Sequence, residues 1–204
     1  QSIMKFPTPD AESYEESLAY TRRFIEEWKD HPLIVPSVAP HAPYTCTDEI
    51  LQACADLAVE YDVPLQIHIL ETRQEAEDSW AEFEKKVVER VGDLGVFRAK
   101  TLAAHCVHVD GEQIRMIREH DVAVAHNPTS NLKLASGIAP IKEMLERGVR
   151  LSVGTDGAAS NNDLDMFEEM RLAALLVKGA TYDPTALPAR EALLMATRWG
   201  AEAL

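Results

Sequence analysis

The stretch TLAAHCVHVDGEQIRMIREH, residues 101–120, contains a short apolar run followed by a longer amphipathic one. Residues 101–107 are typical of a buried strand, and residues 110–120 have the apolar spacing of a helix. The same order of strand and helix recurs on both sides of this stretch. Further strands are predicted at 33–39, 64–70, 122–125 and 150–154. Helices are predicted at 10–28, at 47–61 with Thr47 as N-cap, within 74–91, and at 138–147, 164–177 and 189–204.

Strands that alternate with helices of this length predict a parallel sheet built from βα units. We count about five such units, preceded by one helix that we expect to open at Pro9 and Asp10. Because no linker or low-complexity segment interrupts the units, residues 1–204 are predicted to form one domain. A complete α/β barrel takes about 250 residues, whereas this chain has 204.

An open doubly wound sheet and a closed (β/α)8 TIM barrel both fit this pattern. The open fold would carry a GxGxxG or P-loop motif after its first strand, and the sequence has neither. Polar residues instead follow nearly every predicted strand: His41, His68 and Glu71, His105 and His108, His126 and Asn127, and Asp156. In a closed barrel these strand ends converge on the face that carries active sites. The predicted fold class is therefore α/β, an incomplete TIM barrel.

Composition excludes several classes of partner. The net charge of −14 argues against nucleic acid, which requires clustered Lys and Arg. No apolar run approaches the roughly 18 residues of a membrane span, and residues 1–10 show no signal peptide. Three cysteines without CxxC spacing argue against a disulfide framework, so a cytoplasmic location is expected.

Four residues carry the candidate chemistry: His68, Glu71, His105 and Asp156. Taken alone, His68 within IHI is typical of a core histidine whose ring is hydrogen-bonded to a backbone carbonyl. A carboxylate three positions later either orients such a histidine or transfers protons in the same cavity. His105 and Asp156 occupy matching positions on later strands, and this repetition favours a shared site over four independent core residues.

Histidine nitrogen and aspartate oxygen are the usual ligands of a catalytic ion of the zinc class, which keeps one position open for water. Such an ion lowers the pKa of water to about 7. An aspartate that touches both metal and water can take a proton from the water. A glutamate across the pocket can deliver a proton to a ring nitrogen. The residues therefore suit hydrolytic attack on an electrophilic carbon.

Five motifs carry a family resemblance: PHAPYT (40–45), IHILETRQE (67–75), LAAHCVHVD (102–110), AHNPTSNLKLASGIAP (125–140) and SVGTDGAASNNDLDMFEEMR (152–171). Together they resemble the amidohydrolase superfamily, in the branch of methylthioadenosine/S-adenosylhomocysteine deaminases, guanine deaminases and triazine hydrolases. GTDGAASNN combined with HNPTSN and PHAPYT is most similar to the methylthioadenosine/S-adenosylhomocysteine deaminase group. The resemblance implies a metal-dependent hydrolase barrel that deaminates a purine nucleoside to the inosine analogue.

The resemblance also implies a role for each matching residue. His68 corresponds to a metal ligand, and Asp156 to a ligand that also serves as base. Glu71 corresponds to the acid that protonates the purine ring nitrogen. His105 corresponds to a histidine that polarises or orients the attacking water more than it binds metal. His41 and Ser160 correspond to substrate contacts.

The implied cofactor is one divalent ion, with zinc first and iron or nickel as alternatives. The implied partner is a small purine nucleoside, with no nucleic acid or membrane, in a full-length homo-oligomer. Two other readings stay open: a hydrolase of another heterocycle (guanine, a pyrimidine or a chlorinated triazine), and a non-catalytic barrel fragment that binds a ligand.

The sequence departs from the family's pattern at its start. The family's first barrel strand carries an HxH pair of metal ligands, but the only histidine before His41 is His31, which has no such partner. We therefore expect the early barrel strands and the flanking β-sandwich to be absent, and the chain alone to be inactive.

Overall fold

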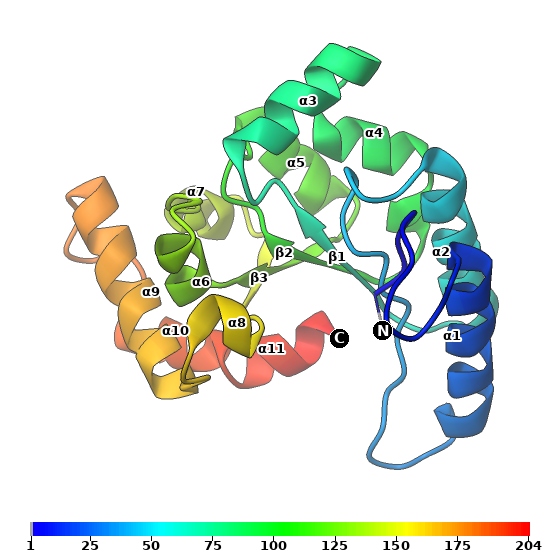
Figure 1. The fold of residues 1–204 in the computed structure, drawn as a ribbon. Coiled ribbons are helices and arrows are strands. Elements are labelled where there is room, and N and C mark those ends of the chain that lie inside the picture. The colour runs from blue at the N-terminus through cyan, green and yellow to red at the C-terminus, as the bar shows by residue number, and fades with distance from the viewer. Residues whose placement is uncertain (1) are drawn as a thin grey trace.

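The computed structural model describes residues 2–204, which form a parallel four-stranded sheet in the order β1-β2-β3-β4 with helices packed around it (Figure 1). The strands are β1 (Leu65–Ile69), β2 (Thr101–His105), β3 (Ala123–His126) and β4 (Arg150–Val153). The first helices are α1 (Tyr14–Trp28), α2 (Asp48–Tyr61), α3 (Arg73–Phe83), α4 (Val87–Asp93), the 3-10 turn η1 (Val96–Arg98) and α5 (Gly111–Glu119). The later helices are α6 (Pro128–Lys133), α7 (Ile141–Glu146), α8 (Ala158–Asn161), α9 (Met166–Thr181), α10 (Ala189–Met195) and α11 (Arg198–Ala203).

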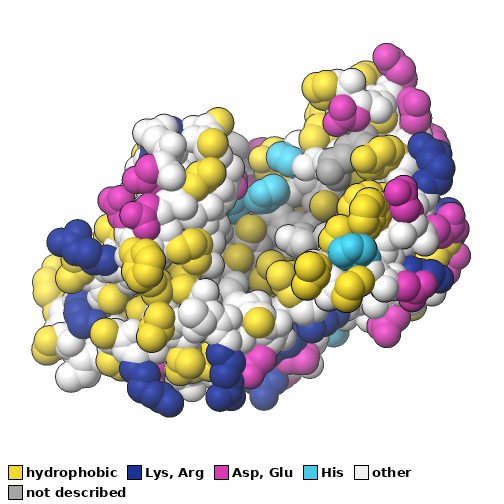
Figure 2. Space-filling model, turned by 90° about the horizontal axis from the view of Figure 1, so that it is seen from below, with side chains coloured by type: hydrophobic (Ala, Val, Ile, Leu, Met, Phe, Trp, Pro, Cys, Tyr) yellow, Lys and Arg dark blue, Asp and Glu magenta, His cyan; other side chains and the backbone are white. Residues whose placement is uncertain are grey.

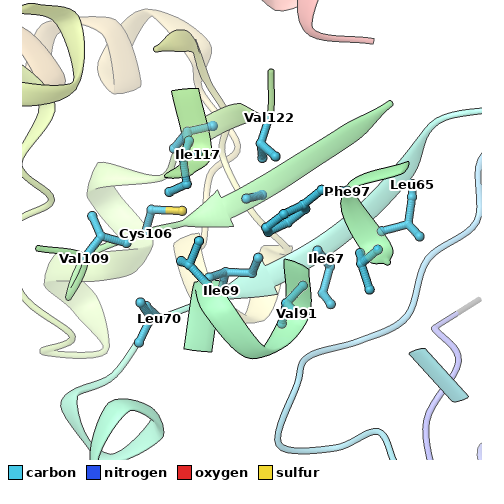
Figure 3. Close-up of a cluster of buried hydrophobic side chains, with 14 of the residues drawn as sticks. Leu65, Ile67, Ile69, Leu70, Val91, Phe97, Cys106, Val109, Ile117 and Val122 are labelled. Atoms are coloured by element: carbon cyan, nitrogen blue, oxygen red, sulfur yellow. The ribbon is translucent and has the colours of Figure 1, made fainter. Parts of the chain in front are cut away.

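Side-chain alternation divides the sheet into a core face and a second face. One row across the sheet consists of Ile67, Ala103, Val124 and Leu151, which pair in register and are all buried. Figure 3 shows Ile67 packed close to Val91 and Phe97, which come from α4 and η1. The adjoining row begins with His68 and points to the opposite face, because successive side chains of a strand alternate in direction. The helices therefore pack against the apolar row, and the row that contains His68 faces the candidate site.

The strand predicted at 33–39 is wrong for most of its length. Only Val38 pairs with β1, as an isolated parallel bridge to Leu65. The Val38 N–H donates to the Pro64 carbonyl at 2.9 Å, while Leu33 is 88% exposed. Pro36 has no N–H to donate, so the segment cannot continue a ladder of strand hydrogen bonds. This segment lies at the edge of the sheet as extended chain.

Two helix starts illustrate how the polar residues act as caps. The Thr47 side chain accepts a hydrogen bond from the Ile50 N–H at 3.4 Å, which confirms Thr47 as the N-cap of α2. The predicted start of α1 at Asp10 is wrong, because the helix begins at Tyr14 with Ser13 as its N-cap. Hydroxyl oxygens at this position satisfy an N–H that has no partner within the helix.

Within residues 2–204, no helix is both long enough and apolar enough to cross a bilayer. Cys46, Cys54 and Cys106 are free and buried.

Candidate metal and catalytic site

His68 lies near the carboxyl end of β1, on the face opposite the apolar core row. Its Nδ1 lies 2.5 Å from the carbonyl oxygen of His41. A carbonyl can only accept, so Nδ1 carries the proton and donates it to that oxygen. The other ring nitrogen, Nε2, is then left with a free lone pair. This tautomer is the one in which a neutral histidine binds metal.

His105 reaches the same region only because the backbone turns at the end of β2. Regular alternation would place His105 on the face of Ala103, which belongs to the apolar core row. His105 has a φ of 72° and Cys106 a φ of 49°, both in the left-handed region. Such conformations are unfavourable for residues with a side chain and cluster at functional sites. Here they turn the strand end, and the imidazole lies beside that of His68.

The His105 ring is oriented by a single buried partner. Its Nδ1 lies 2.8 Å from Oδ1 of Asn131, an oxygen that can only accept, so Nδ1–H is the donor. Nε2 faces Glu71, whose Oε2 lies 3.8 Å away. That distance is beyond a direct hydrogen bond. The two side chains therefore lie side by side without a direct hydrogen bond.

Asp156 follows β4 in the turn Gly154–Gly157 and has a φ of 62°. Ser130 Oγ donates a hydrogen bond to its Oδ2 at 2.7 Å. Burial raises the pKa of Asp156, but hydrogen bonds from Ser130 and the Gly157 backbone, with the charges of His105 and His68, outweigh burial. The net result is a pKa below the ordinary value, so Asp156 is a carboxylate at neutral pH.

These elements bring together one compact group of ligand atoms. His68, His105 and Asp156 each offer an atom that lies within 4.8 Å of the others. The rings of His68 and His105 are stacked with centroids 5.4 Å apart. Figure 2 shows a hollow on this molecule with histidine side chains in its wall. Neutral imidazole nitrogens and an ionised carboxylate fit a divalent ion of the zinc class.

Of the two predicted substrate contacts, His41 lies beside this group and Ser160 lies in the short helix that follows Asp156. The ring of His41 is 5.0 Å from that of His68, and its Nδ1 is 2.9 Å from Thr45 Oγ1. Burial, and then the charge of His68, lowers the pKa of His41, with partial compensation from Glu71. Ser160 lies half-buried in α8, where its N–H donates to the Gly157 carbonyl at 3.0 Å. Ser160 is therefore in the turn that follows Asp156.

Of two further histidines, His108 has a hydrogen-bond partner for its ring, whereas Nδ1 of His126 is buried without one among residues 2–204. His108 Nε2 lies 2.7 Å from the carbonyl oxygen of Ser136. His126 is 1% exposed, and burial, followed by the charge of His105, lowers its pKa to about 3. The His126 carbonyl accepts from the Gly154 N–H at 2.9 Å, which joins β3 to the turn before Asp156.

Sequence reasoning missed four polar residues that hold the cluster in place. They are Ser130, Asn131, Asn161 and Glu169, all of them buried. The available signal, for Ser130 and Asn131 only, was the polar run TSN shortly after a predicted strand. Buried polar groups of this kind need hydrogen-bond partners, and here three of the partners are His105, Asp156 and Thr155.

Glu75 lies in the first turn of α3, four residues after Glu71, and is 5% exposed. Its Oε2 accepts from the Glu71 backbone N–H at 3.1 Å, and its N–H donates to Thr72 Oγ1 at 3.4 Å. Burial raises the pKa of Glu75 to about 7. Backbone hydrogen bonds from Leu70 and Glu71 lower this pKa, and the charge of Glu71 raises it by a smaller amount. Glu75 is therefore a buried acid that loses its proton near neutral pH.

This shift predicts a pH-dependent stability. Between the unfolded value of 4.5 and about 7 the folded chain binds more protons, so stability falls as pH rises through that interval. Each unit of difference corresponds to about 1.4 kcal/mol. We expect Glu75→Gln, which stays neutral, to lose less Tm than the unmodified protein between pH 5 and pH 8. Thermal unfolding at both pH values measures the effect, and equal losses of Tm in the two proteins would contradict it.

The geometry can now be compared with known proteins. Residues 2–204 match the model of the amidohydrolase family. A 5-methylthioadenosine/S-adenosylhomocysteine deaminase of Syntrophobacter fumaroxidans is 47% identical over 99% of this chain. A zinc-bound adenosine deaminase of Xanthomonas campestris superposes with a TM-score of 0.95 and 42% identity over 100% of this chain. A guanine deaminase of C. acetobutylicum, solved with guanine in its active site, has a TM-score of 0.88 and 27% identity over 98% of the chain.

The chain spans about half the length of these proteins: 46% of the first, 46% of the second and 50% of the third. The parallel sheet with its helices is the corresponding part of their barrel, which confirms the predicted α/β fold class. Since the family model matches nearly the whole chain and the identity to a curated relative approaches one half, the chain belongs to the amidohydrolase family.

Proposed function

We propose that this chain supplies part of the active site of a metal-dependent deaminase acting on an adenosine-like purine nucleoside. The observation that carries the proposal is the cluster of His68, His105 and Asp156, with Glu71 beside His105 at 3.8 Å. The net reaction adds water at the carbon that bears the amino group and releases ammonia, leaving the inosine analogue. The substrate class follows from the high identity to proteins named as deaminases of methylthioadenosine and S-adenosylhomocysteine.

In this proposal His68 and Asp156 hold one divalent ion, for which zinc is the first choice and iron or nickel the alternatives. Nε2 of His68 is free to bind because Nδ1 donates to the His41 carbonyl. Asp156 is an ionised carboxylate, one oxygen of which, Oδ2, accepts a hydrogen bond from Ser130. Such an ion, when bound, lowers the pKa of water to about 7 and so makes a nucleophile available at neutral pH.

The remaining steps belong to protein side chains. Asp156, a carboxylate at neutral pH, accepts a proton from the attacking water. His105, held by Asn131, orients that water through Nε2. Glu71 delivers a proton to the purine ring nitrogen, so that the ring carbon accepts the incoming oxygen without building up negative charge. The proton taken by Asp156 leaves with the amino group as ammonia, and the new hydroxyl group returns its proton to Glu71 as the C–N bond breaks.

His41 and Ser160 are the proposed substrate contacts. His41 lies beside His68, and the fall in its pKa keeps the imidazole neutral, able to donate or accept one hydrogen bond. Ser160, in the turn after Asp156, is assigned to the ribose or its 5′ substituent. A cytoplasmic location accompanies the proposal, because the three cysteines are buried and free.

The test is a substrate panel with the protein extended to the length of its curated relatives. We expect adenosine, methylthioadenosine or S-adenosylhomocysteine to be converted, with the ultraviolet change from adenine to hypoxanthine and one ammonia released per turnover. Turnover of guanine or of a chlorinated triazine, with none of any adenosine, would favour the second reading of a related heterocycle hydrolase. A metal-loaded protein that turns over no member of the panel would contradict both.

A further inference from the structure

Glu169 of α9 is a buried carboxylate that no step of the proposed reaction uses. Its side chain is 1% exposed. Oε1 accepts a hydrogen bond from Asn161 Nδ2 at 2.7 Å, and Oε2 accepts one from the Thr129 backbone N–H at 3.2 Å. Among residues 2–204 no Lys, Arg or His lies within ion-pair distance of it. Burying a carboxylate without a cation is costly, and the two N–H donors are what compensates for it here.

Both donors belong to segments that hold Asp156. Thr129 directly precedes Ser130, whose hydroxyl donates to Asp156 Oδ2 at 2.7 Å. Asn161 Nδ2, besides its bond to Glu169, donates to the Thr155 carbonyl at 2.8 Å. The Glu169 carboxylate is therefore hydrogen-bonded to two segments. Residues 129–130 contact the Asp156 side chain, and Asn161 contacts the backbone of Thr155, the residue before Asp156.

The arrangement of the helices explains how one residue can do this. Figure 1 shows α6, α8 and α9 close to one another, and α6 contacts both of the others. Ser130 lies in α6, Asn161 ends α8, and Glu169 lies in the first turn of α9. The two short helices have few residues with which to fix their own positions. α9 is the long element of the three, and Glu169 is the buried polar contact through which it meets both.

Asp156 needs such support because of its backbone conformation. Its φ of 62° is in the left-handed region, which few residues with a side chain adopt and which contacts with the surroundings stabilise. The direction of the carboxylate depends on that conformation. A change in the Ser130 or Thr155 contact would therefore turn the carboxylate relative to His68 and His105.

We propose that Glu169 is a positioning residue that sets the orientation of Asp156 through Ser130 on one side and through Asn161 and Thr155 on the other. The inference rests on the proposed function, in which Asp156 holds the metal and accepts a proton. A carboxylate is required at this position because both of its oxygens face N–H donors. A glutamine of the same shape offers one acceptor and turns an N–H₂ group toward the second donor.

The first experiment compares Glu169→Gln with Glu168→Gln in the protein extended to the length of its relatives. Glu168 is exposed and adjacent on the same helix, so it is the matched control. We expect Glu169→Gln to lower kcat/KM about 10- to 100-fold, mainly through kcat, and to weaken metal binding in a chelator competition. The visible spectrum of the cobalt(II)-substituted protein should also shift, since it reports ligand geometry. The control should match the unmodified protein in all three measurements.

A double-mutant cycle separates positioning from simple support of the fold. If Glu169 acts through Ser130, the variant Ser130→Ala/Glu169→Gln should lose less than the product of the two single losses in kcat/KM. Multiplicative losses would show two independent effects and overturn the proposal. So would a Glu169→Gln protein that has a lower Tm but keeps the cobalt spectrum and metal affinity of the unmodified protein.

If Glu169→Gln does not fold, Asn161→Ala decides the question. This variant removes the bonds to Glu169 and Thr155 but leaves the bond between Glu169 and Thr129. A shifted cobalt spectrum would support the proposal, and an unchanged spectrum would overturn it. The spectral and metal-binding readouts need no substrate. A protein that binds cobalt but turns over no adenosine would therefore refute the proposed function while the role of Glu169 could still be tested.

Discussion

Replacing Glu71 by glutamine, in the protein extended to the length of its relatives, is expected to lower kcat by about 10²- to 10⁴-fold and to leave the metal content unchanged. Glutamine keeps the size and the hydrogen-bonding oxygen of the side chain but has no proton to transfer at neutral pH. Glu71 Oε2 lies 3.8 Å from His105 Nε2, whereas the compact group of ligand atoms is formed by His68, His105 and Asp156. Glu71 therefore lies beside this group but is not one of its members, which agrees with the proton-transfer role that we propose for it.

The measurement pairs steady-state kinetics on an adenosine derivative with elemental analysis of the same preparation. Glu77→Gln is the matched control, because Glu77 is an exposed carboxylate further along α3. We expect it to retain full activity. Loss of metal in proportion to activity in Glu71→Gln would mean that Glu71 is itself a ligand. Retention of near-normal kcat would remove Glu71 from the mechanism.

Strand alternation predicts the placement of His68 but not that of His105, for which only the repetition of polar residues at strand ends predicted a place in the site. Both follow apolar residues at the end of a strand. Alternation along β1 places His68 opposite the buried Ile67, as the pattern indicates. The same rule places His105 with Ala103 on the core face. It reaches the site through left-handed backbone at His105 and Cys106, and no residue type in LAAHCV signals that turn, since neither is glycine or asparagine.

The strands within the sheet were easier to predict than the segment at its edge. Four of the five expected strands are present, because Pro64–Leu70 and its counterparts combine β-branched residues with short length. The segment 33–39 has the same composition but lies at the margin of the sheet. Leu33 is 88% exposed and a single residue, Val38, pairs with β1. Apolar composition alone does not distinguish a strand from an extended segment whose ladder a proline interrupts.

The polar residues around Asp156 show a further limit of sequence reasoning. Ser130, Asn161 and Glu169 are separated by up to 39 positions, yet they form one connected group of hydrogen bonds around the turn that carries Asp156. A charged residue in a helix is expected on the solvent-exposed face, and Glu168, which precedes Glu169, is indeed exposed. Which of two adjacent glutamates points inward depends on how α9 is rotated against α6, a tertiary property.

Asp156→Asn is expected to be the most damaging single change, because it removes two functions at once. Asparagine retains one oxygen that can approach the metal but carries no charge and cannot accept the proton of the attacking water. We expect metal affinity to fall by about 10- to 100-fold, the range of losses known for residues that support a ligand and so a lower limit here. Loss of proton transfer should add a further fall in kcat of about 10²- to 10⁴-fold.

The matched control is Asp163→Asn, since Asp163 is an exposed carboxylate in the same β4–α9 connection. Metal content, chelator competition and kcat are measured for both variants and for Ser130→Ala. Ser130→Ala leaves Asp156 in place but removes the 2.7 Å hydrogen bond to its Oδ2. It should therefore lose less metal affinity and less kcat than Asp156→Asn.

The assignment of Asp156 as both ligand and base is tested by measuring the kcat of Asp156→Asn at saturating metal. If excess zinc restores kcat to Asp156→Asn, the residue only binds the ion, and another group must accept the proton. If kcat remains low in a protein shown to be fully loaded, the carboxylate is needed for proton transfer as well. Asp156 is ionised at neutral pH, so it is in the form that can accept a proton.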